Sequence, residues 1–208
     1  MNFKINKSWA CRNAANGITL FGVLLNQILK WVIFAHTEWM WIIFGVAAGS
    51  VGTDWIDGPV ARYLDRKGYA GSISDFGKAV DRFRDKDFQL TMLFFLIWHP
   101  MVDYPLKWLL WPLVVAEIVL LVTLFRAVKK KADASATNWG RYKMFLECVV
   151  ILASLLAILA KKHGIIIPTY ITYPVFGTAI VAVFFAIMSI ISHVTDPCKS
   201  QPPWPDDL

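Results

Sequence analysis

Apolar side chains gather into six long runs along the chain, and short polar or charged segments separate them. A helix needs about 20 mostly apolar residues to cross a bilayer. The pattern therefore predicts an all-α integral membrane protein with six transmembrane helices. Their ranges are expected to be 16–35, 38–64, 77–98, 106–128, 142–160 and 169–194.

The third run differs from the others because only its second part, "LTMLFFLIW", is apolar. This stretch is too short to cross a bilayer alone, so its helix is expected to begin within "GKAVDRFRDKDFQ". The second run ends in a charged stretch as well, "GTDWIDGPVAR" at residues 52–62. The two charged helix ends are predicted to face the same side of the membrane.

Basic residues are concentrated before the first run and in the loops after the second and fourth runs. This bias predicts that both termini and these two loops lie in the cytoplasm. We expect a multi-pass protein of the cell (plasma) membrane, with residues 1–208 forming one membrane domain. Residues 1–15 are predicted to be an interfacial helix, with a disordered tail as the alternative, and residues 196–208 a flexible tail.

The composition agrees with this class of protein. Of the 208 residues, 57% are hydrophobic, and 21 Lys and Arg exceed 15 Asp and Glu to give a net charge of +6. In a membrane protein, such an excess is typical of cytoplasmic loops and of contact with anionic lipid, so no nucleic-acid partner is expected. The three cysteines are far apart and fit neither a disulfide framework nor a thiolate metal site.

Four acidic residues stand at helical spacings on the two charged helix ends. Asp54 and Asp57 are three residues apart, whereas Gly77, Asp81 and Asp85 are each four apart, so each set shares one helix face. Clustered carboxylates repel each other unless cations lie between them. Oxygen ligands suit Mg²⁺ or Mn²⁺. Two such divalent cations would indicate phosphoryl transfer, in which metals stabilise the attacking and leaving oxygens.

Other classes of function explain these acids less well. Each acid alone could pair with a basic neighbour at a solvated helix end, but four regular spacings are not accounted for in that way. An ion-coupled transporter would place acids near the membrane midplane, often on broken helices in two related halves, and no paired halves are visible. A non-catalytic membrane scaffold needs no such pattern.

The two charged stretches resemble a known signature. "DWIDGPVAR" at residues 54–62 and "GKAVDRFRD" at residues 77–85 resemble D-x2-D-G-x2-A-R-x8-G-x3-D-x3-D of the CDP-alcohol phosphotransferases. Six spans also resemble that family. This chain has 14 residues where the signature has eight. A rival register with Gly71 and Asp75 keeps eight but ends on Ala79, so we prefer the register of Gly77.

The resemblance implies an enzyme that transfers a phosphate-linked group from a CDP-alcohol to an acceptor hydroxyl and releases CMP. It implies that Asp85 is the catalytic residue that takes the acceptor proton. The implied metal ligands are Asp54, Asp57, Asp81 and Asp85. The implied binding residues for the cytidine diphosphate are Asp54, Gly58, Ala61, Arg62 and Gly77. The site would lie at the cytoplasmic face, and family members are often dimers, so a homodimer is expected.

Three cations predict a phosphorylated acceptor: Arg126 at the end of the fourth run, and Arg141 and Lys143 at the start of the fifth. Contact with lipid headgroups is an equally good explanation. "NWGRYK" at residues 138–143 is similar to the "W-x-G-K-x-K-T" stretch of bacterial phosphatidylglycerophosphate synthases, although Met144 replaces the threonine. We therefore expect phosphatidyl transfer from CDP-diacylglycerol to glycerol 3-phosphate in phospholipid biosynthesis.

The first run indicates a different acceptor. "NGITLFG" at residues 16–22 resembles the family's "P-N-x-L-T-x-x-R", but Ala15 replaces the proline and Gly22 replaces the arginine. A glycine there is similar to choline and ethanolamine phosphotransferases, whose acceptor is diacylglycerol, although close helix packing also explains it. Inositol phosphate and serine are further alternative acceptors.

Overall fold

The computed structural model of this chain describes residues 7–67, 75–129, 138–166 and 168–195. Side chains are described in these ranges except at residues 7–16, 57–58, 61–62, 64–65, 75–79, 126–129, 169, 171 and 193–195. Within the described ranges the chain forms six α-helices and no strand. They are α1 (Lys7–Ala35), α2 (Met40–Arg66), α3 (Asp75–Trp98), α4 (Tyr104–Lys129), α5 (Asn138–Lys162) and α6 (Thr169–Thr195).

The all-helical class is confirmed, and each helix coincides with one apolar run. The helix α3 begins at Asp75 and carries its charged residues in its first turns, as the short apolar part of the third run predicts. The helix α1 begins at Lys7 and continues without a break to Ala35. The predicted interfacial segment is therefore helical from Lys7, while residues 1–6 lie outside the described chain.

Four helices contain stretches that are long and apolar enough to cross a membrane: Gly17–Ala35, Tyr104–Phe125, Asn138–Lys162 and Thr172–Ser192. The chain is a multi-pass membrane protein. In α2 the apolar stretch Met40–Ile56 is shorter, and α3 has no such stretch in the part that is described. Crossing by α2 and α3, and the cytoplasmic position of the termini, stay predictions.

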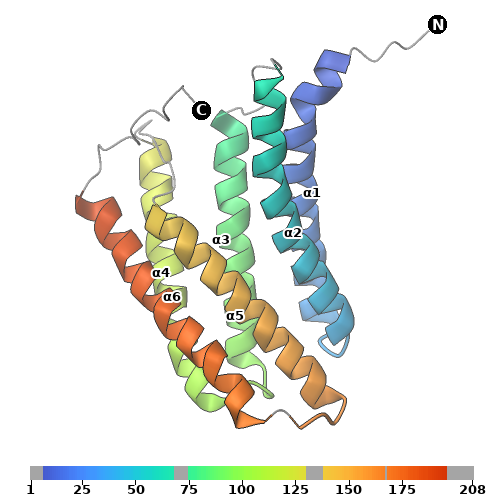
Figure 1. The fold of residues 1–208 in the computed structure, drawn as a ribbon, viewed down its shortest axis with the longest axis vertical. Coiled ribbons are helices and arrows are strands. Elements are labelled where there is room, and N and C mark those ends of the chain that lie inside the picture. Colours follow the sequence, from blue (N-terminus) through green and yellow to red (C-terminus); the bar gives the residue numbers. More distant parts are fainter. Residues whose placement is uncertain (1–6, 68–74, 130–137, 167, 196–208) are drawn as a thin grey trace, which may run out of the picture. The chain divides into compact units, whose positions relative to one another are not determined.

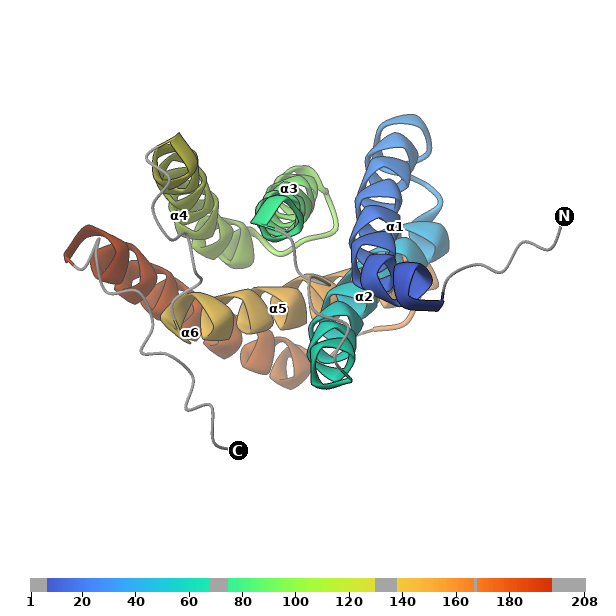
Figure 2. The ribbon, with the colours of Figure 1, turned by 90° about the horizontal axis from the view of Figure 1, so that it is seen from above.

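The chain divides into two compact units. The N-terminal unit is Met1–Phe88 and the C-terminal unit is Gln89–Leu208, so the boundary falls inside α3. In the N-terminal unit α1 packs along α2, as Figures 1 and 2 both show. The Cβ of an alanine at Gly49 of α2 would lie 3.7 Å from Leu25 Cδ1 of α1. This is an ordinary van der Waals distance, so α1 and α2 are close enough here for a methyl group at position 49 to make contact.

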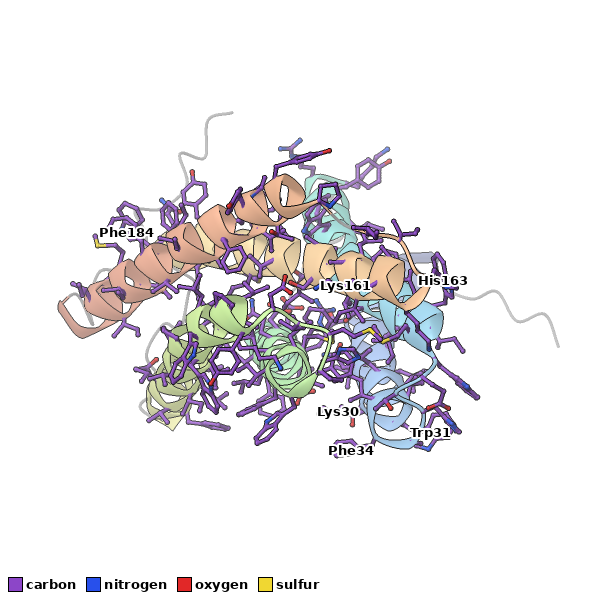
Figure 3. The ribbon with its side chains drawn as sticks, turned by 90° about the horizontal axis from the view of Figure 1, so that it is seen from below. Lys30, Trp31, Phe34, Lys161, His163 and Phe184 are labelled. Atoms are coloured by element: carbon purple, nitrogen blue, oxygen red, sulfur yellow. The ribbon has the colours of Figure 1, made fainter. Side chains whose placement is uncertain are left out.

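In the C-terminal unit α6 packs against both α4 and α5 (Figure 1). Small residues form the contact face, since Ala179, Ala182 and Ala186 of α6 are buried. Large apolar side chains are exposed on the outer faces of the helices instead, and Phe184 projects outward from α6 (Figure 3). An outward apolar surface is expected for helices whose solvent is lipid.

Candidate metal centre

The N-terminal unit brings three of the predicted metal ligands together. Asp54 of α2 and Asp81 and Asp85 of α3 each offer one carboxylate oxygen, and these oxygens lie within 4.8 Å of one another. The four-residue spacing explains why Asp81 and Asp85 share a face of α3. All three side chains are partly buried.

Arg84 neutralises part of this charge, and its side chain is only 2% exposed. Its Nη2 lies 2.5 Å from Asp54 Oδ1, 3.2 Å from Asp81 Oδ1 and 3.3 Å from Asp85 Oδ1. One guanidinium therefore contacts all three carboxylates. The sequence pattern assigned Arg84 no part in the site, because three basic residues alternate with the acids in "DRFRDKD" and spacing alone does not say which of them turns inward.

Gly22 of α1 makes room for this guanidinium. A Cβ at Gly22 would lie 2.4 Å from Arg84 Nη1 and 3.0 Å from Arg84 Cδ, closer than side-chain atoms normally approach. The family pattern that "NGITLFG" resembles has an arginine at this position, whereas this chain has a glycine. The structure gives that glycine a specific contact, because the arginine of α3 fills the space that a side chain on α1 would take.

A buried polar network fixes the three helices around the centre. Asn26 Nδ2 of α1 donates to the carbonyl oxygen of Arg84 at 2.9 Å, and Ser50 Oγ of α2 donates to Asn26 Oδ1 at 2.6 Å. One amide of α1 thus joins α2 and α3. Sequence analysis missed both residues, although an isolated Asn or Ser within an apolar run is a signal, since buried polar groups need partners.

The donor set fits a divalent cation. Among the described side chains, Asp81 Oδ1 is buried and accepts no hydrogen bond, although Arg84 Nη2 is near it. Three carboxylates and one guanidinium leave the cluster with two excess negative charges. At 4.8 Å two carboxylates repel each other by about 3 kcal/mol at an effective dielectric constant near 20. Oxygen-only ligands of this kind are those that Mg²⁺ and Mn²⁺ prefer.

The remaining predicted residues of the centre cannot be placed by their side chains. Asp57, Gly58, Ala61 and Arg62 belong to α2, and Gly77 belongs to the first turn of α3, but their side chains lie outside those described. Their roles as metal ligand or cytidine diphosphate contacts stay predictions.

The predicted acceptor residues belong to the C-terminal unit. Arg141 is exposed at the start of α5, and the side chain of Arg126 lies outside those described. Lys143 is buried on α5, where its Nζ forms an ion pair with Glu117 of α4 and lies 3.4 Å from Glu147 Oε2. All three side chains are at most 1% exposed. Sequence analysis missed the two glutamates, which are isolated acids within apolar runs.

The comparison with known families gives one finding. A family model described as CDP-alcohol phosphatidyltransferase matches residues 12–195, which include every residue that the sequence assigned to the site. No curated protein and no solved structure gives a significant match.

Proposed function

Because the chain belongs to the CDP-alcohol phosphatidyltransferase family, we propose that it transfers a phosphatidyl group from CDP-diacylglycerol to glycerol 3-phosphate and releases CMP. Membership itself makes the chain a transferase of phospholipid synthesis. The observation that carries the proposal is the gathering of Asp54, Asp81 and Asp85 within the matched residues. The acceptor is proposed from the basic residues of α4 and α5.

We infer that the three carboxylates, with Asp57 as a fourth, hold divalent cations, of which Mg²⁺ or Mn²⁺ suits oxygen ligands. The bound cations would neutralise charge on the diphosphate of the donor. The excess negative charge of the cluster supports this proposal, because Arg84 alone does not balance it. Gly58, Ala61 and Gly77 would permit close approach of the cytidine diphosphate, and Arg62 would bind its phosphate oxygens.

Asp85 is proposed to take the proton of the acceptor hydroxyl. The hydroxyl oxygen forms a bond to the phosphorus that carries diacylglycerol, and the bond from this phosphorus to CMP breaks. CMP leaves with the electron pair, and the proton moves to an Asp85 carboxylate oxygen. Asp85 lies 3.3 Å from Arg84 Nη2, which helps to fix its orientation. Proton transfer to a positioned carboxylate contributes about 10²- to 10⁴-fold to rate.

The acceptor phosphate is proposed to be bound by Arg126, Arg141 and Lys143. Arg141 is exposed and can reach an anionic ligand. Lys143 is already paired with Glu117 and Glu147, so Arg126 and Arg141 would provide most of the positive charge. The cytoplasmic face, the plasma membrane and a homodimer are proposed as the setting of the reaction.

The pairing of Lys143 favours a second candidate, in which the acceptor carries no phosphate. Lys143 already contacts two buried glutamates, which makes it less available to bind an anion. Gly22 is also similar to the glycine of phosphotransferases that act on diacylglycerol. The second candidate is therefore transfer from CDP-choline or CDP-ethanolamine to diacylglycerol.

The test is CMP release by purified protein with Mg²⁺. CDP-diacylglycerol is supplied with glycerol 3-phosphate, inositol phosphate or serine in separate reactions, and CDP-choline or CDP-ethanolamine is supplied with diacylglycerol. We expect release with glycerol 3-phosphate, and a loss of at least about 100-fold in Asp85→Asn. CMP release only with another donor and acceptor would overturn glycerol 3-phosphate as the acceptor. No CMP release with any donor and acceptor would overturn the proposed transfer reaction.

Asp87→Asn is the matched control. Asp87 lies on the same helix two residues from Asp85, but it pairs with Lys30 Nζ at 2.6 Å instead of joining the carboxylate cluster. It should retain CMP release. Thermal unfolding of both variants shows that they fold, so that a loss in Asp85→Asn alone can be assigned to the chemistry.

A further inference from the structure

A cavity of about 370 Å³ lies within the C-terminal unit, between the first turns of α4 and α6 and the last turns of α5. A volume of this size is typical of sites that bind small molecules. Most of its lining is apolar, including Leu106, Ile158, Val175 and Phe176. No residue of the metal centre contributes to it.

One face of α5 forms the long wall of this cavity. Ser154, Ala157, Ile158 and Lys161 all line it, and their spacing of three, four and seven residues places them on one side of a helix. The wall rises about 10 Å over these seven residues. The small side chain of Ala157 leaves space where a larger residue would fill the cavity.

Ser154 supplies one polar group inside this apolar wall. Its side chain is 4% exposed, and its hydroxyl has no hydrogen-bond partner among the described residues. A buried hydroxyl without a partner is destabilising, because it has lost its hydrogen bonds to water. A ligand that placed an acceptor oxygen in the cavity would remove this cost.

One lysine, Lys161, lines the rim of the cavity, and two more lie near the adjoining turn. Lys161 Nζ at the end of α5 (Figure 3) lies 2.8 Å from Asp103 Oδ1 and donates to the carbonyl oxygen of Met101 at 3.0 Å. His99 lies in the turn between α3 and α4, next to Met101. Burial lowers the pKa of His99, and the nearby Lys107 and Lys162 lower it further. Lys107 and Lys162 therefore add positive charge beside the ion pair of Lys161 with Asp103.

The rim also lies at the level of an aromatic belt. Tyr104 and Trp108 of α4 and Tyr170 and Tyr173 of α6 are exposed and flank residues that line the cavity. Exposed Tyr and Trp near the ends of membrane helices mark the depth of the lipid headgroups. An apolar cavity below this level, with cations above it, is complementary to a lipid with an anionic headgroup.

We propose that this cavity is a second lipid site, which binds a membrane phospholipid with an anionic headgroup. One acyl chain fills the apolar part, and Ser154 donates a hydrogen bond to its ester carbonyl oxygen. The lysines of the rim face the phosphate. This site is separate from the metal centre and does not depend on the proposed reaction.

The test is native mass spectrometry of detergent-purified protein with added phosphatidylglycerol or phosphatidylcholine. We expect at least fivefold tighter retention of one phosphatidylglycerol. Ala157→Phe, which fills the cavity, should weaken this retention at least tenfold, and Ser154→Ala about threefold. Replacing both Lys161 and Lys162 with Gln should remove the preference for phosphatidylglycerol.

Two variants outside the cavity are the controls. Val149→Phe places the same large residue on an exposed position of α5, and Ser189→Ala removes another buried hydroxyl that has no partner among the described residues. Both should retain phosphatidylglycerol as the unaltered protein does. Equal retention by Ser154→Ala, Ala157→Phe and the controls would overturn the site. Equal retention of both lipids by the unaltered protein would overturn the proposed preference for an anionic headgroup.

Discussion

At the scale of single residues, Arg84 is expected to hold the acidic cluster together when no cation is bound. Arg84→Gln leaves three neighbouring carboxylates without their guanidinium. Removing one partner of a buried ion pair typically lowers the free energy of unfolding by about 3 kcal/mol. We expect a large fall in the thermal unfolding midpoint in EDTA, which millimolar Mg²⁺ restores because Mg²⁺ binds the folded state.

Lys30→Gln is the control for this prediction, because it removes the partly exposed ion pair of Lys30 with Asp87 and leaves Arg84 in contact with the three carboxylates. It should change the unfolding midpoint little, and the effect of Mg²⁺ should equal that in the unaltered protein. An Arg84→Gln midpoint that does not respond to Mg²⁺ would show that Arg84 acts through packing alone.

The spacing of the acids could be predicted from the sequence, whereas the partners of the basic residues could not. Asp81 and Asp85 share a helix face through local geometry alone. The inward position of Arg84 depends on Gly22, which is 62 residues away in the chain. Lys143 shows the same limit, since its predicted phosphate contact competes with an ion pair to Glu117 on another helix.

At the scale of elements, the end of α5 depends on Gly164, which has a φ of +74°. Ile165 N donates to the carbonyl oxygen of Ala160 at 2.9 Å, and Gly164 N donates to that of Lys161 at 3.0 Å. This is a Schellman motif, in which glycine takes the left-handed conformation. We expect Gly164→Ala to lower the free energy of unfolding by about 1 kcal/mol, measured by thermal unfolding in detergent.

Gly177→Ala in α6 is the opposite control. In the described part of the chain, an added Cβ at either glycine meets no atom within 4 Å, so the two positions differ in their backbone conformation. Gly177 lies inside a helix, where alanine is favoured by up to about 1 kcal/mol, and this variant should be at least as stable as the unaltered protein. A loss of stability in both variants would contradict the role given to the left-handed turn.

The helices themselves follow from the apolar runs, because hydrophobic length decides which segments enter a membrane. Their ends follow less well. The helix α1 extends back to Lys7 and α5 to Asn138, into polar residues that carry no apolar periodicity. Such residues continue a helix that an adjacent apolar segment has already nucleated, and the hydrophobic pattern does not record them.

At the scale of the whole molecule, the open question is whether α2 and α3 cross the membrane. The apolar stretch Met40–Ile56 of α2 has 17 residues, about 25 Å of helix against a hydrocarbon core of about 30 Å. Its charged end carries Asp54, and Arg84 joins Asp54 to Asp81 and Asp85 of α3. These paired charges can lie at the membrane surface, so they need not enter the hydrocarbon core. The helix α2 can therefore still cross the membrane although its apolar stretch is short.

Labelling of single cysteines distinguishes six spans from four. Glu38, Lys67 and His163 are replaced in turn with Cys, in a chain without its three native cysteines, and intact cells are treated with an impermeant maleimide. Six spans with a cytoplasmic N-terminus predict labelling at positions 38 and 163 but not at 67 until the membrane is permeabilised. If α2 and α3 instead lay at the outer surface without crossing, position 67 would be labelled from outside. The metal centre would then lie on the side opposite to the cytoplasm. Labelling at position 67 therefore tests both the number of spans and the proposed cytoplasmic position of the metal centre.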